Sequence, residues 1–246
     1  MINLLNDSTF LSKYDLTPQT SVSIFIPNTY EVYWTITPEN LFKRMVRESE
    51  KFWNENRLEK AQKTGLTKIE IITLASIIEE ESNKKSEKPT IAGLYMNRLK
   101  KGMLLQSDPT VKFAIQDFTI RRILRVHLET DSPYNTYRYV GLPPGPIRIP
   151  SIESIDAVLN YQVHNYIYMT AKADFSGYHA FATTYEEHQK NAVSYRRALN
   201  KRRIFHGFQK FLTSTKIANS LLYLCIPKRK DYVLRTPSRP HTIFHP

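Results

Sequence analysis

TLASIIEEES, residues 73–82, is the most informative stretch of this sequence, because it places three glutamates at the end of an apolar helix. Thr67 and Glu70 precede it in the Thr-x-x-Glu pattern of a capping box, in which each side chain binds the other residue's backbone N–H at a helix start. An apolar run follows at once. We therefore expect a helix that begins at Thr67 and continues through the three glutamates.

Helical spacing separates Glu81 from the other two glutamates. Residues three, four and seven positions apart share one face of an α-helix. Those neighbours are Leu74, Ile77 and Ile78 for Glu81, Ile72, Ala75 and Ser76 for Glu79, and Thr73, Ser76 and Ile77 for Glu80. Glu81 has only apolar neighbours, so we expect it to be partly buried, with a raised pKa that suits a general acid. The alternative is that all three glutamates form a solvated helix end.

Length and composition predict a soluble protein with a sizeable core. The chain has 246 residues, of which 41% are hydrophobic, and this suits one domain of about 170 to 200 residues with extensions. Cys225 is the only cysteine, which excludes an intrachain disulfide and a thiolate metal cluster. The seven histidines lack HExxH spacing, so we expect no metal and no other cofactor. We find neither an apolar run long enough to cross a bilayer nor a secretory signal pattern.

The net charge of +12 is concentrated at the C-terminal end of the sequence. Residues 205–246 hold seven Lys and Arg against one Asp, which is half of the whole excess. The remaining body is only mildly basic, a property that fits any polyanion or carboxylate-bearing polymer. This distribution argues against a nucleic-acid partner.

The pattern of apolar residues and breakers predicts a mixed, helix-rich chain. Expected strands are 22–26, 166–172 and 178–182, and expected helices are 38–61, 67–81, 89–102, a short one from Asp108, 151–159 and one from Thr184 to about Arg203. Residues 204–246 are expected to form an irregular basic tail.

Two loops and two histidines are further candidates for a site. Asp108 before Pro109 is typical of a helix start. The Asp108 carboxylate could therefore serve as a helix cap instead of having a chemical role. The glycines and prolines of residues 141–150 forbid regular structure, and rigid loops of this kind often line sites. His179 and His188 flank the start of the last helix. For each of them we favour the role of a hydrogen-bonded structural residue over that of a catalytic residue.

Several motifs together resemble the endolytic murein transglycosylases of the MltG (YceG-like) family. They are FIPNTY at 25–30, ASIIEEES at 75–82, NRL at 97–99, QSDPTV at 106–111, YNTY at 134–137, GLPPGPI at 141–147, and HAF with EEH between 179 and 188. Their order and spacing match the family across roughly residues 23–203. The resemblance implies an α+β fold: a helix-rich, lysozyme-like catalytic domain at 37–203 with a small antiparallel sheet, preceded by an N-terminal remnant and first strand at 1–36 and followed by the tail at 204–246.

The resemblance also implies a lyase that cuts inside peptidoglycan strands. Such enzymes cleave the β-1,4 bond from N-acetylmuramic acid to N-acetylglucosamine and leave a 1,6-anhydro-muramic end. The family's catalytic glutamate falls on Glu81, the residue that the helical face selects independently, and Glu81-Ser82 resembles the Glu-Ser pair of other lytic transglycosylases. Gln106, Asp108, Tyr134 and Asn135 are the implied sugar-binding residues because they stand in matching motifs.

The sequence departs from the family pattern in four places. The N-terminal membrane helix and the LysM-like region normal for the family are not found, so the chain resembles the C-terminal catalytic portion and would meet a membrane only through an anchor outside it. Asn28 replaces the usual acid of Pro-Asp-Thr-Tyr, Glu80 adds a third carboxylate, and the tail after Arg203 matches nothing in the family. The implied location is the bacterial envelope, on the periplasmic side of the inner membrane, with glycan strands as substrate and peptidoglycan synthases as candidate partners.

Two other functions remain open from the sequence. A hydrolytic muramidase could use the same Glu81 with water in place of the muramic 6-hydroxyl. A non-catalytic module that binds glycan or nucleic acid would suit the positive charge and the 15 tyrosines, but it would not need a carboxyl on an apolar helix face.

Overall fold

The structure, a computed structural model, describes residues 1–120 and 122–214, and their side chains as far as Arg202. The chain divides into two compact units, residues 1–198 and 199–246. The described α-helices are α1 (Ile2–Leu5), α2 (Ser8–Leu11), α3 (Pro38–Phe52), α4 (Glu55–Thr64), α5 (Lys68–Glu81), α6 (Lys88–Lys100), α7 (Asp108–Ile115), α8 (Arg125–Leu128), α9 (Ile152–Leu159) and α10 (Tyr185–Ser214). Short 3-10 helices are η1 (Ser12–Tyr14), η2 (Ser21–Ile24) and η3 (Lys85–Glu87), and the strands are β1 (Tyr168–Ala171) and β2 (His179–Ala182).

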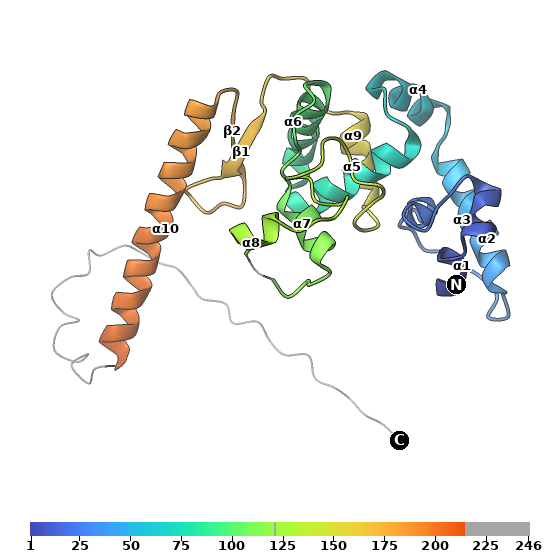
Figure 1. Cartoon of the computed structure of the whole chain (residues 1–246), viewed down its shortest axis with the longest axis horizontal. Coiled ribbons are helices and arrows are strands. Elements are labelled where there is room, and N and C mark those ends of the chain that lie inside the picture. The colour runs from blue at the N-terminus through green and yellow to red at the C-terminus, as the bar shows by residue number, and fades with distance from the viewer. Residues whose placement is uncertain (121, 215–246) are drawn as a thin grey trace, which may run out of the picture. The chain divides into compact units, whose positions relative to one another are not determined.

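Helix α5 is the centre of the first unit. Its predicted capping box is present: Thr67 Oγ1 accepts from the N–H of Glu70, and the Glu70 carboxylate accepts from the N–H of Thr67 at 2.8 Å. Every residue from Ile71 to Ile78 is buried, so the helix is enclosed on all sides and not along one stripe only. Figure 1 shows α6 and α9 beside it, and all three helices contribute to one hydrophobic core.

A second, smaller core lies in the N-terminal segment. Phe42 and Met45 of α3 pack with Leu11, Leu16 and Ile24. Phe42 is fully buried, and the rings of Phe10 and Tyr14 each lie 5.0 Å from its ring. The apolar face of α3 therefore covers the short helices that precede it.

The described strands form one antiparallel pair in which Tyr168 faces Ala182 and Ala171 faces His179. The helix-rich α+β class with a small antiparallel sheet is therefore confirmed. Both strands are shorter than predicted but lie within the predicted ranges.

The strand predicted at 22–26 is wrong, because residues Ser21–Ile24 form the 3-10 helix η2. The Ser21 hydroxyl binds the carbonyl of Pro18 at 2.9 Å, and the N–H of Ser23 binds the carbonyl of Thr20 at 2.9 Å. These local bonds satisfy the backbone without a partner strand, and burial of Ile24 explains the apolar pattern.

The single helix predicted at 38–61 is also wrong. Helix α3 ends at Phe52, and α4 begins at Glu55 after Asn54, whose side-chain oxygen accepts from the N–H of Arg57 at 3.0 Å. Asparagine is a strong helix N-cap, so it starts a new helix and turns the chain.

The other helices follow the predictions closely, apart from their ends. Ser151 caps α9 as expected, whereas Ser107, not Asp108, is the residue before α7. Helix α10 continues to Ser214, beyond the expected end near Arg203, since no proline follows until Pro227. Residues 204–214 of the expected irregular tail are therefore helical, and residues 215–246 lie outside the described part of the chain.

Candidate active site

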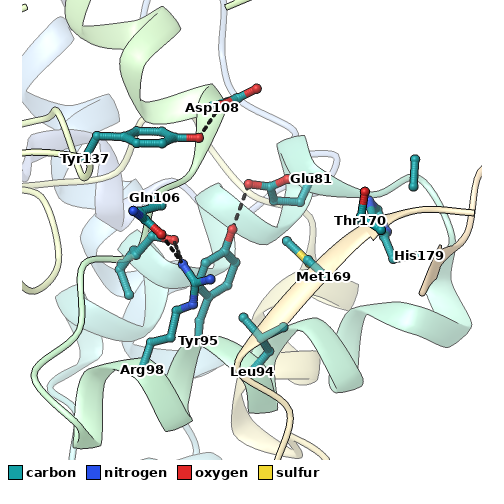
Figure 2. Close-up of a pocket in the computed structure, with 12 residues that line it drawn as sticks. Glu81, Leu94, Tyr95, Arg98, Gln106, Asp108, Tyr137, Met169, Thr170 and His179 are labelled. Carbon is teal, nitrogen blue, oxygen red and sulfur yellow. Dashed lines mark hydrogen bonds between the residues drawn. The ribbon is translucent and has the colours of Figure 1, made fainter. Parts of the chain in front are cut away.

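Glu81 is the last residue of α5, and its carboxyl is held by two neighbouring segments. The Tyr95 hydroxyl, from α6, donates a hydrogen bond to Oε1 at 2.7 Å (Figure 2), and the Ser107 hydroxyl donates to the same oxygen at 2.5 Å. Within the described part of the chain, no residue donates to Oε2. One carboxyl oxygen is thus fixed, while the other is available to a ligand.

Burial raises the pKa of Glu81 above its ordinary value, and this effect exceeds the lowering by the hydrogen bonds from Ser107 and Tyr95. The negative charge of Asp108 raises this pKa further, whereas the charge of His179 lowers it. The position at the C-terminus of α5 acts in the raising direction, because the helix dipole disfavours a negative charge there. The residue is half-buried and lines a cavity, so its carboxyl is desolvated but within reach of a ligand in that cavity. Such a carboxyl can carry a proton to a substrate.

The open side of Glu81 faces a cavity of about 210 Å³. Its walls come from α5, α6, the 104–108 segment, the 133–139 loop and both strands (Figure 2). The lining residues are Glu81, Leu94, Tyr95, Arg98, Leu105, Gln106, Asp108, Tyr137, Met169, Thr170, Ala171 and His179. Polar groups therefore converge on one carboxyl from elements far apart in the sequence.

Arg98 ties two walls of the cavity together. Its guanidinium donates to the carbonyl of Ile167 at 2.7 Å, just before β1, and to the carbonyl of Leu105 at 2.7 Å. The side chain is buried, which lowers the pKa of Arg98 from its ordinary value. Through these backbone bonds and a 3.4 Å contact with Oε1 of Gln106, Arg98 positions the 104–106 segment and the strand beside Glu81.

Gln106 and Asp108, both predicted as site residues, line the cavity with Glu81. Gln106 has a φ of 51°, a left-handed conformation that is unusual for this residue type, and its N–H binds the carbonyl of Thr136 at 3.0 Å. Asp108 accepts a 2.6 Å hydrogen bond from the hydroxyl of Tyr137. Burial, together with this bond and the charge of Asp108, raises the pKa of Tyr137 well above its ordinary value, so Tyr137 remains a donor.

Tyr134 and Asn135, the other two predicted site residues, do not line this cavity. Asn135 is fully buried, and its amide donates to the carbonyls of Leu128 at 2.9 Å and Thr130 at 2.7 Å, while its oxygen accepts from the N–H of Tyr137. The Tyr134 ring packs on Phe113 with centroids 4.7 Å apart. Both residues hold the loop that brings Tyr137 to the cavity.

The three consecutive glutamates have three different environments. Glu79 accepts hydrogen bonds from Lys88 at 2.9 Å and from the hydroxyls of Ser151 and Ser154. Although burial opposes it, the hydroxyls and the Lys88 charge lower the pKa of Glu79 to about 2, so Glu79 is a charged structural link from α5 to α6 and α9. Glu80 is exposed and pairs with Arg148.

Another carboxylate, that of Glu87, contacts the cavity-lining residue His179. Glu87 was not predicted as a site residue. It is 5% exposed and accepts from His179 through both the backbone N–H, at 2.7 Å, and Nδ1, at 2.9 Å. His179 itself lines the cavity, whereas His188 stacks on Tyr168 outside it. His179 is therefore hydrogen-bonded, as interpreted from the sequence, but it also lies at the site. The expected hydrogen bond of the His188 ring is not found, because its buried Nδ1 has no partner among the residues that the structure describes.

Some cavity residues that were not predicted as site residues nevertheless stand in the sequence motifs. Arg98 belongs to NRL, Tyr137 to YNTY and His179 to HAF, so a contribution from each motif could have been expected. Tyr95 and Glu87 lie outside these motifs. Tyr95 reaches Glu81 because α6 packs on α5, and Glu87 reaches the site through its contact with His179 of β2.

Two properties of the described residues complete the site. Across residues 1–120 and 122–214, no group of three or more His, Cys, Asp or Glu side chains is arranged to hold a metal ion. In the same part of the chain, no helix combines the length and the apolar character needed to cross a bilayer.

Comparison with known proteins identifies the family. The sequence pattern of the YceG-like family matches residues 2–194. The chain is 37% identical over 164 residues to the endolytic murein transglycosylase of Bacillus subtilis (strain 168), covering 67% of this chain and 44% of that protein. It is 30% identical over 173 residues to the endolytic murein transglycosylase of Streptococcus pneumoniae serotype 2 (strain D39), covering 69% of this chain and 31% of that protein.

A solved structure agrees with this assignment. The 2.6 Å crystal structure of a yceG-like protein from Listeria monocytogenes matches with a TM-score of 0.66 and 31% sequence identity, covering 77% of this chain and 66% of that one. The chain spans less than half the length of the curated relatives named above. The match over most of its own length nevertheless shows that the chain belongs to the YceG-like family.

Proposed function

We propose that this chain is the catalytic portion of a peptidoglycan lytic transglycosylase. It would cleave the β-1,4 bond from N-acetylmuramic acid to N-acetylglucosamine inside glycan strands and leave 1,6-anhydro-muramic ends. The observation that supports this most directly is the Glu81 carboxyl, with its raised pKa, one fixed oxygen and one oxygen open to a polar cavity. The names of the relatives from Bacillus subtilis and Streptococcus pneumoniae point to the same reaction.

A single acid is sufficient for this chemistry. Protonated Glu81 gives its proton to the glycosidic oxygen as the bond from that oxygen to the muramic anomeric carbon breaks. The 6-hydroxyl of the same muramic ring then bonds to the anomeric carbon, and its proton returns to the enzyme. Ordinary glycosidases use two carboxylates, but an internal nucleophile replaces the second one.

Substrate binding is assigned to the residues around Glu81. Gln106 and Asp108 line the cavity and would bind sugar hydroxyls and amides directly. Tyr134 and Asn135 would contribute through the loop that they hold, because their contacts are with that loop and with Phe113. Peptidoglycan strands are the proposed substrate, peptidoglycan synthases are proposed partners, and the envelope side of the inner membrane is the proposed location.

A hydrolytic muramidase is the second candidate, and Asp108 favours it. This carboxylate lines the same cavity as Glu81, and its charge is close enough to raise the pKa of Glu81. Two carboxylates in one cavity are the arrangement that glycoside hydrolysis uses.

The products distinguish the two reactions. Purified glycan strands are incubated with the protein, and the fragments are analysed by mass spectrometry. The transglycosylase gives 1,6-anhydro ends, lighter by one water than the reducing ends that a muramidase gives. Glu81→Gln should lower the rate of either reaction about 100-fold to 10,000-fold, and Glu80→Gln is the matched control.

Reducing ends alone would replace the transglycosylase by the muramidase. No cleavage by this chain, and none by a longer form that carries a membrane anchor, would favour a glycan-binding module. Wild-type turnover by Glu81→Gln would reject Glu81 as the acid in both reactions.

A further inference from the structure

The carboxylate of Glu87 has no part in the single-acid reaction, yet it is among the most buried charged groups of the residues whose side chains the structure describes. It is 5% exposed and accepts three hydrogen bonds. The backbone N–H of His179 donates to Oε1 at 2.7 Å, and the hydroxyl of Ser82, next to Glu81, donates to Oε2 at 3.2 Å. The third contact joins Oε2 to Nδ1 of the His179 ring at 2.9 Å. A carboxylate is buried at considerable cost, and these partners offset it.

The contacts of Glu87 determine which nitrogen of His179 carries the proton. An N–H and an O–H donate to the two carboxyl oxygens, so Glu87 acts as an acceptor on both. The ring nitrogen that faces it must then be the donor, Nδ1–H. In a neutral imidazole the other nitrogen, Nε2, therefore has a lone pair and accepts hydrogen bonds or protons.

His179 presents this ring to the catalytic cavity. It is the first residue of β2 and lines the cavity together with Glu81 (Figure 2). Its side chain is 17% exposed, and Nε2 has no hydrogen-bond partner among the residues that the structure describes. The charge of His179 lowers the pKa of Glu81, so the two groups interact across the cavity. One side chain that can give a proton and one that can accept a proton thus share a single cavity.

We infer that His179 is a second proton-transfer residue of this site, which accepts the proton of the attacking hydroxyl while Glu87 positions its ring. The inference rests on the proposed function and refines it. Glu81 gives its proton to the glycosidic oxygen as the bond to the anomeric carbon breaks. The attacking oxygen bonds to that carbon as its proton passes to Nε2. Glu81 is left as a carboxylate and His179 as an imidazolium, and a proton returns from the imidazolium to Glu81 through solvent.

A purely structural role for His179 would require fewer of its atoms than proton transfer does. A link between β2 and η3 needs the backbone N–H and the Nδ1 contact with Glu87, but it does not need Nε2. Asparagine keeps an N–H donor at the position of Nδ1 and has no counterpart of Nε2. His179→Asn therefore separates the two roles.

The pH dependence of turnover adds a second readout. The titratable or charged groups around the ring come from several elements: Glu87 on η3, Glu81 on α5, Tyr95 and Arg98 on α6, Asp108 on α7, and Tyr137 on the 133–139 loop. A base that must be neutral and an acid that must be protonated give a bell-shaped profile. In His179→Asn the low-pH limb should disappear, while the limb that reports Glu81 remains.

The experiment measures cleavage of purified glycan strands by the whole chain and by its variants, with thermal unfolding as a check of the fold. Wild type and Glu81→Gln come first. An active Glu81→Gln, or a wild type that is inert both as this chain and as a longer form with a membrane anchor, overturns the proposed function itself. If wild type cleaves and Glu81→Gln does not, His179→Asn should lower kcat about 100-fold to 10,000-fold with little change in KM. Added imidazole should restore part of the turnover of His179→Ala. His127→Asn, outside the cavity, should match wild type.

Glu87→Gln tests the positioning role. The new amide donates to Nδ1 and moves the ring proton to Nε2, so turnover should fall in a folded protein. Nitrogen NMR of the wild-type His179 ring shows which ring nitrogen carries the proton. This measurement does not depend on activity, and it is informative even where a variant fails to fold. A proton on Nδ1 supports the inference, whereas a proton on Nε2 in the neutral ring overturns it. Turnover of folded His179→Asn within about threefold of wild type also overturns it, while the proposed function stands.

Discussion

The hydroxyl of Tyr95 lies 2.7 Å from Oε1 of Glu81 and donates a hydrogen bond to it, which joins the middle of α6 to the last residue of α5. The bond fixes the carboxyl and leaves Oε2 towards the cavity. It also lowers the pKa of Glu81, against the larger opposite effect of burial. Tyr95 therefore tunes the acid as well as holding it.

Tyr95→Phe should raise the pKa of Glu81, because it removes a hydrogen bond that favours the carboxylate. The high-pH limb of turnover, where the acid loses its proton, should move to higher pH. The variant should also lose about 1 to 2 kcal/mol of stability with the buried bond. Rates measured across pH check this, with Tyr139→Phe, outside the cavity, as the control. A limb that stays in place or moves to lower pH would show that the hydroxyl does not tune Glu81.

Glu81→Gln should make the folded protein more stable than wild type at neutral pH. The ordinary pKa of this carboxyl is 4.5, and the folded state raises it, so the folded state binds the proton more tightly than the unfolded chain. The free energy of unfolding of the wild type therefore falls as pH rises above 4.5 through the folded pKa. Glutamine does not titrate and still offers an oxygen to Tyr95 and Ser107. Urea unfolding at several pH values measures the difference, which should grow with pH; a constant or negative difference contradicts the raised pKa.

Glu79→Gln should destabilise the protein by about 3 to 5 kcal/mol, because it leaves the ammonium of Lys88 buried without its partner. The Lys88 side chain is 5% exposed and that of Glu79 20%. Glu80→Gln, which breaks the exposed pair with Arg148, should cost no more than about 1 kcal/mol and is the matched control. Urea unfolding at neutral pH compares them, and equal losses would refute the structural role of Glu79.

The acid stability of the wild type follows from the same carboxylate. The pKa of Glu79 is lowered from 4.5 to about 2, so its contribution is complete above pH 4.5 and is lost as pH falls through the folded pKa. The free energy of unfolding should decline over that window in the wild type and less steeply in Glu79→Gln. Parallel declines would assign the acid sensitivity to other groups.

Gly93→Ala should destabilise the protein even though alanine favours a helix by about 1 kcal/mol over glycine. A Cβ at position 93 would lie 2.1 Å from the carbonyl oxygen of Gln162 and 2.7 Å from Nε2 of His164. The segment that leads to β1 must therefore move away from α6, at a cost of about 1 to 3 kcal/mol. Thermal unfolding measures the net change, and a rise in Tm would contradict the close approach.

Local signals in the sequence determined most of the helices and the identity of the candidate acid. Thr67 and Glu70 are three residues apart, so their capping box forms wherever α5 is placed. The i−3, i−4 and i−7 neighbours of Glu81 are likewise fixed by helix geometry. Ser151 and the two strand segments were predictable for the same reason: the bonds or patterns that define them lie within a few residues.

Only the tertiary structure decided how these elements are used. An apolar run at 22–26 fits a strand or a buried turn, and the absence of a neighbouring strand to pair with it among the described residues selects η2. Glu79 and Glu81 acquire opposite pKa shifts because of what other elements place around them. Hydrogen bonds from Ser151 and Lys88 lower the pKa of Glu79 against its burial, whereas burial raises the pKa of Glu81 and exceeds the lowering by Ser107 and Tyr95.

Glu87 and His179 are the clearest case, since 92 residues separate them in the sequence. No local sequence pattern at either residue predicts this contact. It exists because β2 packs beside η3. The sequence by itself singled out Glu81 as the candidate acid, because that prediction depends on spacing along one helix. The tertiary structure decided what surrounds that carboxyl, because desolvation, hydrogen bonds and neighbouring charges depend on distances that sequence spacing does not fix.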